Sequence, residues 1–253
     1  VDVDRFRPVV MVKAQDGLCA EVGEPFVPMS PSRVLDNPQV ALRQIGAGDP
    51  LVGWGPTAAE LADRGAGFYL DFPGEALRPG CLYARDAARY GAGGPPVVQG
   101  RVVTQPDRPG LVVAQYWLYW YYNDWNNRHE SDWEGVQLVF EASSTAEALA
   151  GSPVEAGYAQ HEGGERAAWD GDELEREGDR PVVYSSRRSH ASYYGSSLFL
   201  GRSATEGFGC DDTDGPSVRL DPVLELMPDP PTAGPDRAGW LTYEGLWGER
   251  GQG

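Results

Sequence analysis

The sequence predicts a mainly β protein, an antiparallel β-sandwich with short peripheral helices and long loops. Thirty-three Gly and twenty-one Pro imply many turns, and strand-like segments recur at the spacing typical of sandwiches. A chain of 253 residues is long enough to bury one large core. We therefore expect a single domain over residues 1–253, with residues 1–55 as an irregular N-terminal layer of that domain.

The expected elements follow from local composition. The strongest strand signal is the segment 110–122, which is dense in β-branched and aromatic residues. Further strands are expected at 8–13, 135–140, 154–160, 181–185, 197–200, 217–226 and 240–245. Short helices are expected at 57–64, 83–90 and 144–150. The acidic segment 170–178 is expected to be a helix or a surface loop.

The net charge limits the classes of partner. A charge of −17 disfavours binding to a phosphate backbone, so we expect no nucleic-acid partner. No apolar run is long enough for a transmembrane segment, and we expect a soluble protein, secreted or cytoplasmic. A single Lys among 21 basic residues is typical of a GC-rich, bacterial genome. The sequence assigns no oligomeric state.

Three cysteines form no metal-binding spacing. An odd number allows one disulfide with a free thiol, or three thiols. Our hypothesis pairs Cys19 with Cys81, because both lie in the N-terminal third, where a cross-link would restrict the unfolded chain most. Cys210 would then be free.

The first candidate site is a set of metal ligands around one predicted hairpin. Asp132 and Glu134 are two residues apart on a strand, so both point to one face. His129 lies in the preceding turn and Asp124 at the end of the long aromatic strand. Three carboxylates and one imidazole suit Mg²⁺ or Ca²⁺ best, with Mn²⁺ as a further candidate. The alternative is a solvated polar turn, and spacing alone favours neither.

The other two histidines lie in Gly-rich and Ser-rich segments. His161 precedes two glycines that allow a ligand to approach the backbone, and His190 follows an Arg pair that suits an oxyanion. The alternatives are an ordinary structural histidine and a serine-rich loop. We expect catalytic roles for His161, His190 and Arg187, and substrate-binding roles for Arg188, Ser189, Glu162 and Tyr193.

Other motifs are weak. The chain contains no serine-nucleophile elbow, phosphate-binding loop or dinucleotide fingerprint. The acidic run 211–215 resembles a calcium loop, but it lacks the Glu that such a loop places at its end. We interpret it as a tight acidic turn.

Four ordered blocks resemble the vacuolar protein sorting-associated protein 62 family. They are Asp132–Val136, Gln160–Gly164, the segment from Pro181 through Tyr193, and Gly209–Asp212. The resemblance covers the chain from Pro8 to about Arg250. That family is mostly uncharacterised, and the resemblance implies no activity.

More distantly, the segment 128–134 resembles the heptapeptide Gly-His-Arg-His-Asp-Trp-Glu of the necrosis- and ethylene-inducing-like cytolysins. That resemblance implies a β-sandwich with a divalent cation held at His129, Asp132 and Glu134, together with Asp124. Arg128, Glu130 and Ser131 depart from the heptapeptide, so the resemblance supports the cation and not the cytolytic activity.

Two classes of function remain open, with a structural or scaffold domain as a third. The first is a metal-dependent hydrolase acting on a phosphorylated or glycosylated substrate, in which a cation polarises an oxygen and a histidine transfers a proton. The second is a non-catalytic module that uses the cation to bind a glycan or a lipid headgroup. A free imidazole beside an open metal position would favour the hydrolase.

Overall fold

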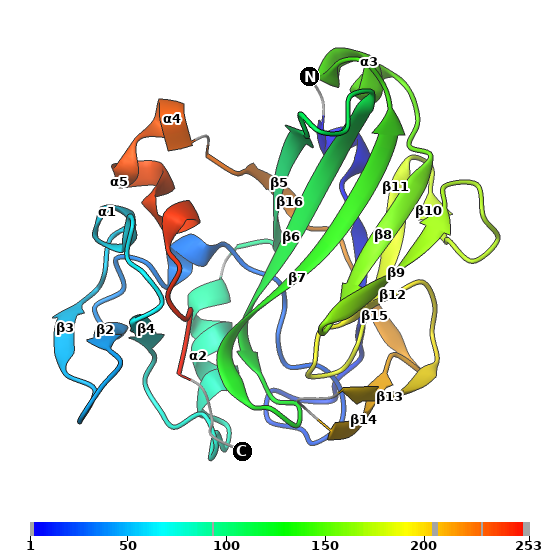
Figure 1. The fold of residues 1–253 in the computed structure, drawn as a ribbon. Helices are drawn as coiled ribbons and strands as arrows, with labels where there is room; N and C mark the ends of the chain where they lie inside the picture. The colour runs from blue at the N-terminus through cyan, green and yellow to red at the C-terminus, as the bar shows by residue number, and fades with distance from the viewer. Residues whose placement is uncertain (1–2, 93, 204–206, 229, 250–253) are drawn as a thin grey trace.

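The protein, described here by a computed structural model covering residues 3–92, 94–203, 207–228 and 230–249, is the mainly β sandwich that the sequence predicts. Its larger sheet has six strands, in the order β16-β5-β6-β7-β8-β9 (Figure 1). Their bounds are β16 Val223–Leu226, β5 Val97–Thr104, β6 Leu111–Asn123, β7 His129–Glu141, β8 Glu155–Gln160 and β9 Gly163–Ala168. All neighbours are antiparallel except β16 and β5.

A second sheet packs against one face of the first. Its strands are β10 Arg176–Glu177, β11 Arg180–Ser185, β1 Val9–Lys13 and β15 Ser217–Leu220, with β12 Ser192–Tyr193 paired to β11. Strands β1 and β11 run parallel, so the sandwich is antiparallel with one parallel pair in each sheet. Two buried tyrosines form hydrogen bonds across the layers: Tyr116 donates to the carbonyl of Val3, and Tyr158 to that of Val182.

The opposite face of the larger sheet is covered by shorter elements. They are a three-stranded sheet of β3 Leu51–Trp54, β2 Ala41–Gln44 and β4 Phe68–Asp71, the helices α1 Ala58–Leu61, α2 Leu82–Gly91, α4 Pro230–Ala233 and α5 Pro235–Ala238, and 3-10 turns at Pro31–Arg33 and Gly239–Thr242. Helix α3 Thr145–Ala150 and the 3-10 turn Val3–Phe6 lie at the top of the sandwich (Figure 1). A separate hairpin of β13 Leu198–Ser203 and β14 Gly207–Asp212 lies at its lower end.

Local signals predicted several elements well. The three expected helices form, with Thr57 and Ser144 as their capping residues for α1 and α3. The expected strand at 240–245 is wrong, because Gly239–Thr242 is a 3-10 turn. Its aromatic residues serve packing instead: Trp240 stacks on Trp133 with ring centroids 5.9 Å apart. Residues 1–55 are more regular than expected, since they supply β1, β2 and β3.

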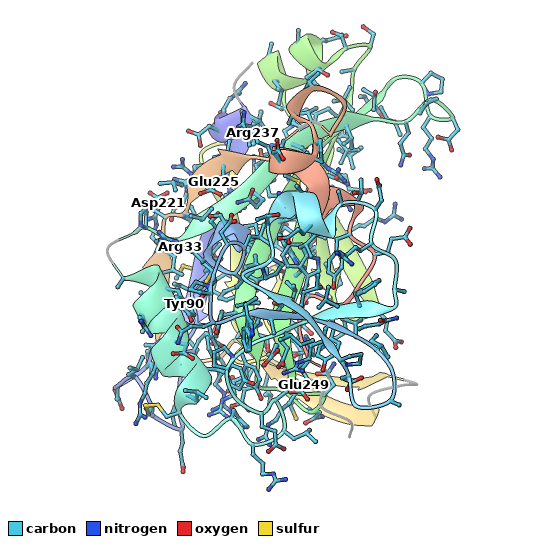
Figure 2. All side chains as sticks on the ribbon, turned by 90° about the vertical axis from the view of Figure 1, so that its left-hand side faces the viewer. Arg33, Tyr90, Asp221, Glu225, Arg237 and Glu249 are labelled. Atoms are coloured by element: carbon cyan, nitrogen blue, oxygen red, sulfur yellow. A yellow bond between two sulfur atoms is a disulfide. The ribbon has the colours of Figure 1, made fainter. Side chains whose placement is uncertain are left out.

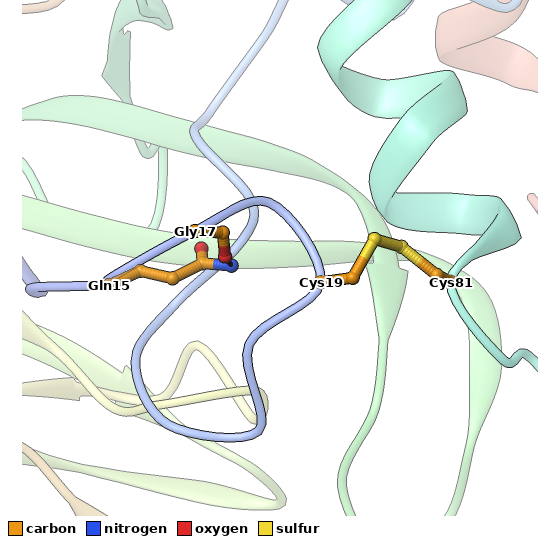
Figure 3. The surroundings of a disulfide bond; sticks show 4 residues. All are labelled: Gln15, Gly17, Cys19 and Cys81. Atoms are coloured by element: carbon orange, nitrogen blue, oxygen red, sulfur yellow. Dashed lines mark hydrogen bonds between the residues drawn. A yellow bond between two sulfur atoms is a disulfide. The ribbon is translucent and has the colours of Figure 1, made fainter.

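The predicted disulfide is confirmed. Cys19 and Cys81 are bonded, with Cα atoms 5.6 Å apart, and Cys210 is free and exposed. Figure 3 shows that the bond joins an N-terminal loop to the beginning of α2. Within the residues that the structure describes, no helix has the length and apolar character needed to cross a membrane.

Candidate functional site

Strand β7 places Asp132 and Glu134 on the face of the larger sheet that packs against the second sheet. The two residues pair with Trp120 and Leu118 of β6, and successive side chains of a strand alternate between faces. Trp133 accordingly points to the other face, where its ring lies 4.8 Å from that of Tyr119. The two carboxylates therefore share one face, as their spacing predicts.

The loop between β11 and β12 brings polar side chains to these carboxylates. Arg188 and His190 both adopt positive φ, 69° and 58°, which is unfavourable for residues other than glycine. Two backbone hydrogen bonds hold the turn: Ser186 donates to Ala191 over 2.9 Å, and His190 donates to Ser186 over 3.0 Å. A backbone held in this uncommon conformation marks the loop as a place where side-chain positions matter.

His190 is the centre of a buried charge cluster. Its ring is fully buried and stacks on Trp120 at 4.3 Å, and its Nδ1 donates to Asp132 over 2.9 Å. The carboxylate of Glu24 lies 3.7 Å from Nε2. Burial alone would lower the pKa of His190, but the two carboxylates outweigh it and raise the pKa to about 9. His190 is therefore a charged, fixed imidazolium at neutral pH.

For Glu134, no contact with the described residues offsets the effect of burial on its carboxylate. It is 6% exposed, and no described residue donates a hydrogen bond to its carboxylate or pairs with it. Burial raises its pKa well above 4.5, and the charges of Asp132 and Asp211 raise it further. A buried carboxylate is costly unless it is protonated, paired or bound to a metal. Glu134 is thus the group in this cluster that must either keep its proton or bind a cation.

Asp211 of β14 is the opposite case. Its carboxylate accepts hydrogen bonds from His161 Nε2 at 2.8 Å, from the hydroxyl of Tyr193 at 2.7 Å, and from Ser186 and Ser189. Burial acts to raise the pKa of Asp211, but these donors outweigh it and lower the pKa. The acidic run 211–215 predicts a tight turn at Asp211. That assignment is wrong for this residue, which lies on a strand and is almost fully buried.

A pocket of about 330 Å³ opens beside Asp211. Trp125 forms one wall, with its ring centroid 4.6 Å from that of His161. The lining combines aromatic rings with polar groups, namely Trp125, Gln160, His161, Glu162, Glu165, Tyr193, Phe199 and Asp211. Its volume is at the small end of the roughly 300–1,000 Å³ range of ligand sites. Three residues predicted from the sequence, His161, Glu162 and Tyr193, therefore share one pocket.

The remaining predicted residues lie in other contacts. Asp124 is paired with Arg128 at 2.9 Å and with Arg188 at 2.8 Å. The Nδ1 of His129 lies 2.6 Å from the carbonyl oxygen of Ser131, and Arg187 donates to the carbonyl of Glu21. Of the four predicted metal ligands, the structure brings Asp132 and Glu134 to one face and engages Asp124 and His129 elsewhere. The four-residue site stays a prediction.

A second acidic group holds the C-terminal segment. Within the described parts of the chain, Asp71, Glu130 and Glu249 form the group of three potential metal ligands within 4.8 Å of one another. Glu130 accepts hydrogen bonds from the Tyr83 hydroxyl and from the backbone of Phe72 and Glu249, and burial raises its pKa to about 8. Figure 2 shows Glu249 below the three-stranded sheet. This group links Glu249 to β7.

Comparison with known proteins gives a partial match to NLPPya, a cytolysin toxin. No family model and no curated protein matches the chain. A crystal structure of an NLPPya mutant is 16% identical, with a TM-score of 0.33, over 52% of this chain and 50% of that one. NLPPya in complex with mannosamine or glucosamine is 13% identical, with a TM-score of 0.31.

These matches span about half the length of NLPPya. The toxin belongs to the class whose heptapeptide resembles residues 128–134, but similarity at this TM-score carries no inference about function. The resemblance to the vacuolar protein sorting-associated protein 62 family stays a prediction.

Proposed function

We propose that this protein is a binding module that holds a divalent cation at Asp132 and Glu134 and takes a sugar or a lipid headgroup in the adjacent pocket beside His161. The observation that carries the proposal is the carboxylate of Glu134, which is buried next to two other acids and has no donor among the described residues. A cation would satisfy Glu134 and offset its repulsion with Asp132 and Asp211.

The residues present fit Mg²⁺ better than Ca²⁺. Ca²⁺ takes six to eight oxygen ligands, whereas Mg²⁺ is commonly bound by one or two carboxylates and keeps several waters. One oxygen of Asp132 is engaged by His190, which orients the carboxylate and leaves its second oxygen for the cation. Asp211, whose carboxylate already accepts four hydrogen bonds, would contribute negative charge near the cation without contacting it.

The histidines favour binding over hydrolysis. A general acid or base must reach the substrate with a ring nitrogen. His190 is buried against Trp120 and hydrogen-bonded to Asp132, and Nε2 of His161 is hydrogen-bonded to Asp211. We therefore place the hydrolase second, with His161, the more exposed of the two rings, as its proton-transfer group.

The pocket composition favours a sugar. Aromatic faces such as that of Trp125 pack on the apolar side of a sugar ring, while carboxylates accept its hydroxyl hydrogens. Glu162 and Glu165 make the pocket acidic, which favours amino sugars over their neutral counterparts. Arg188 lies outside the lining of this pocket, and Ser189 is buried against Asp211.

Calorimetric titration with MgCl₂ tests the cation. We expect wild type to bind one Mg²⁺ with release of protons, because Glu134 must ionise to bind it, and we expect Asp132→Asn and Glu134→Gln to lose the binding. Glu141→Gln is the matched control, since Glu141 is an exposed Glu of the same strand. Unchanged Mg²⁺ binding by Glu134→Gln would reject the site.

A glycan titration tests the pocket. Glucosamine is expected to bind more tightly than glucose, and the difference should shrink in Glu162→Gln. Trp125→Ala should weaken both sugars, since it removes the stacking face. Turnover of phosphate or glycoside substrates that requires Mg²⁺ and His161 would instead establish the hydrolase.

A further inference from the structure

A larger pocket, of about 600 Å³, lies beside Asp124. It is enclosed by the loop around Cys19, the beginning of α2 and the end of β6. Much of its lining is apolar, from Leu18, Phe26, Leu77, Tyr83 and Tyr122. The cation site and the sugar pocket use none of these residues.

Two arginines face this pocket around one aspartate. Arg128 and Arg188 both pair with Asp124, at 2.9 and 2.8 Å. Arg128 also donates to the carbonyl of Leu77, and Arg188 to that of Glu21. A guanidinium has five N–H groups, so most donors of each arginine have no partner among the residues that the structure describes, and Nε of Arg188 is buried without one there.

The pocket lining is less acidic than the chain as a whole. Arg78, Arg128 and Arg188 line the pocket with Glu21 and Asp124, in a protein of net charge −17. Arg78 is paired with Glu75 outside the lining, so Arg128 and Arg188 are the two cations that a ligand would meet. Helix α2 adds to this, because its ten residues begin at the pocket and the Cys81 cap makes no side-chain hydrogen bond. The positive end of its dipole therefore faces the pocket.

We infer that this pocket binds a small organic anion with an apolar body, such as a medium-chain carboxylate or phosphate ester. The anionic head pairs with Arg128 and Arg188, in the bidentate manner that guanidinium groups favour. The body packs against Phe26, Tyr83 and Tyr122. The Cys19–Cys81 bond joins two walls of the pocket and keeps them at the separation that the ligand needs.

A pair of fluorescent probes tests the arginines. Anilinonaphthalene sulfonate carries the anionic group, and phenylnaphthylamine is its neutral counterpart. Both are titrated into the oxidised full chain in EDTA, so that the result is independent of the proposed cation. Arg128→Gln is expected to weaken the sulfonate about tenfold or more and to leave the neutral probe unchanged. Arg166→Gln, which alters an exposed arginine paired with Glu155, is the control.

Competition identifies the ligand chemistry. Octanoate and octyl phosphate should displace the sulfonate more effectively than octanol or inorganic phosphate. Whichever of octanoate and octyl phosphate displaces it more effectively shows whether the pocket prefers a carboxylate or a phosphate. Arg188→Gln, checked for folding by circular dichroism, should repeat the result of Arg128→Gln. Equal binding of the sulfonate by wild type and Arg128→Gln, or equal losses of both probes, would overturn the inference.

Discussion

Replacing Glu134 with Gln is expected to stabilise the metal-free protein at alkaline pH. Burial, Asp132 and Asp211 raise the pKa of Glu134 above its ordinary 4.5, so the folded chain keeps a proton that the unfolded chain has released. The stability that this proton provides is fully present below pH 4.5 and is lost as the pH rises through the folded pKa. Gln cannot ionise, and the variant avoids the loss.

The size of the change in unfolding free energy follows from the one proton that Glu134 holds in the folded chain. Between the unfolded and folded pKa values, wild type loses about 1.4 kcal/mol of unfolding free energy for each pH unit relative to the variant. In a chain of 253 residues this corresponds to roughly 3 to 6 °C in Tm per pH unit. The Gln side chain has the same shape and can donate to the neighbouring carboxylates, so we expect no packing penalty.

Mg²⁺ should make the wild type more stable than Glu134→Gln. A cation at one hundred times its Kd adds about 2.7 kcal/mol to the wild type and nothing to Glu134→Gln. The assay is thermal unfolding by circular dichroism at pH 5 and pH 8, each in EDTA and in MgCl₂, with Glu141→Gln as control. If the Tm difference between wild type and Glu134→Gln were the same at both pH values in EDTA, the reasoning about the buried carboxylate would be refuted.

Three further predictions concern Glu130, His190 and the disulfide bond. The unfolding free energy should fall between pH 4.5 and pH 8 because the pKa of Glu130 is raised to about 8, and limited proteolysis should show the C-terminal segment released first. His190→Leu should cost about 3 to 5 kcal/mol in urea unfolding, because it leaves the buried carboxylate of Glu24 and the mostly buried one of Asp132 without their shared cation; a loss below 1 kcal/mol would contradict the charged pair. Replacing Cys19 and Cys81 with Ser should cost about 4 kcal/mol, from a sequence separation of 62, whereas replacing the third cysteine should cost almost nothing.

The sequence could predict the parts of the site that depend on local geometry. Asp132 and Glu134 share a face because a strand alternates its side chains, and the aromatic run before Asn123 is a strand because its residues suit a buried sheet. The helix caps at Thr57 and Ser144 are likewise local, since each satisfies backbone donors three residues away. Such features need no knowledge of distant segments.

Contacts between distant segments could not be predicted in the same way. Glu24 reaches His190 across 166 positions of sequence, and Asp211 accepts a hydrogen bond from His161 of the turn between β8 and β9. Asp124 was expected beside Asp132, yet two arginines hold it at a separate pocket. Nothing local distinguishes a carboxylate that meets a cation from one that meets an arginine.

What the sequence by itself determined is therefore the β class, the face of each strand and the residue types available for chemistry, because propensity and period are properties of neighbouring residues. The tertiary structure alone decided which carboxylates are paired and which one, Glu134, is buried without a donor among the described residues. The burial and the pairing of a side chain depend on all the segments that surround it, and the pKa of a buried acid depends on both.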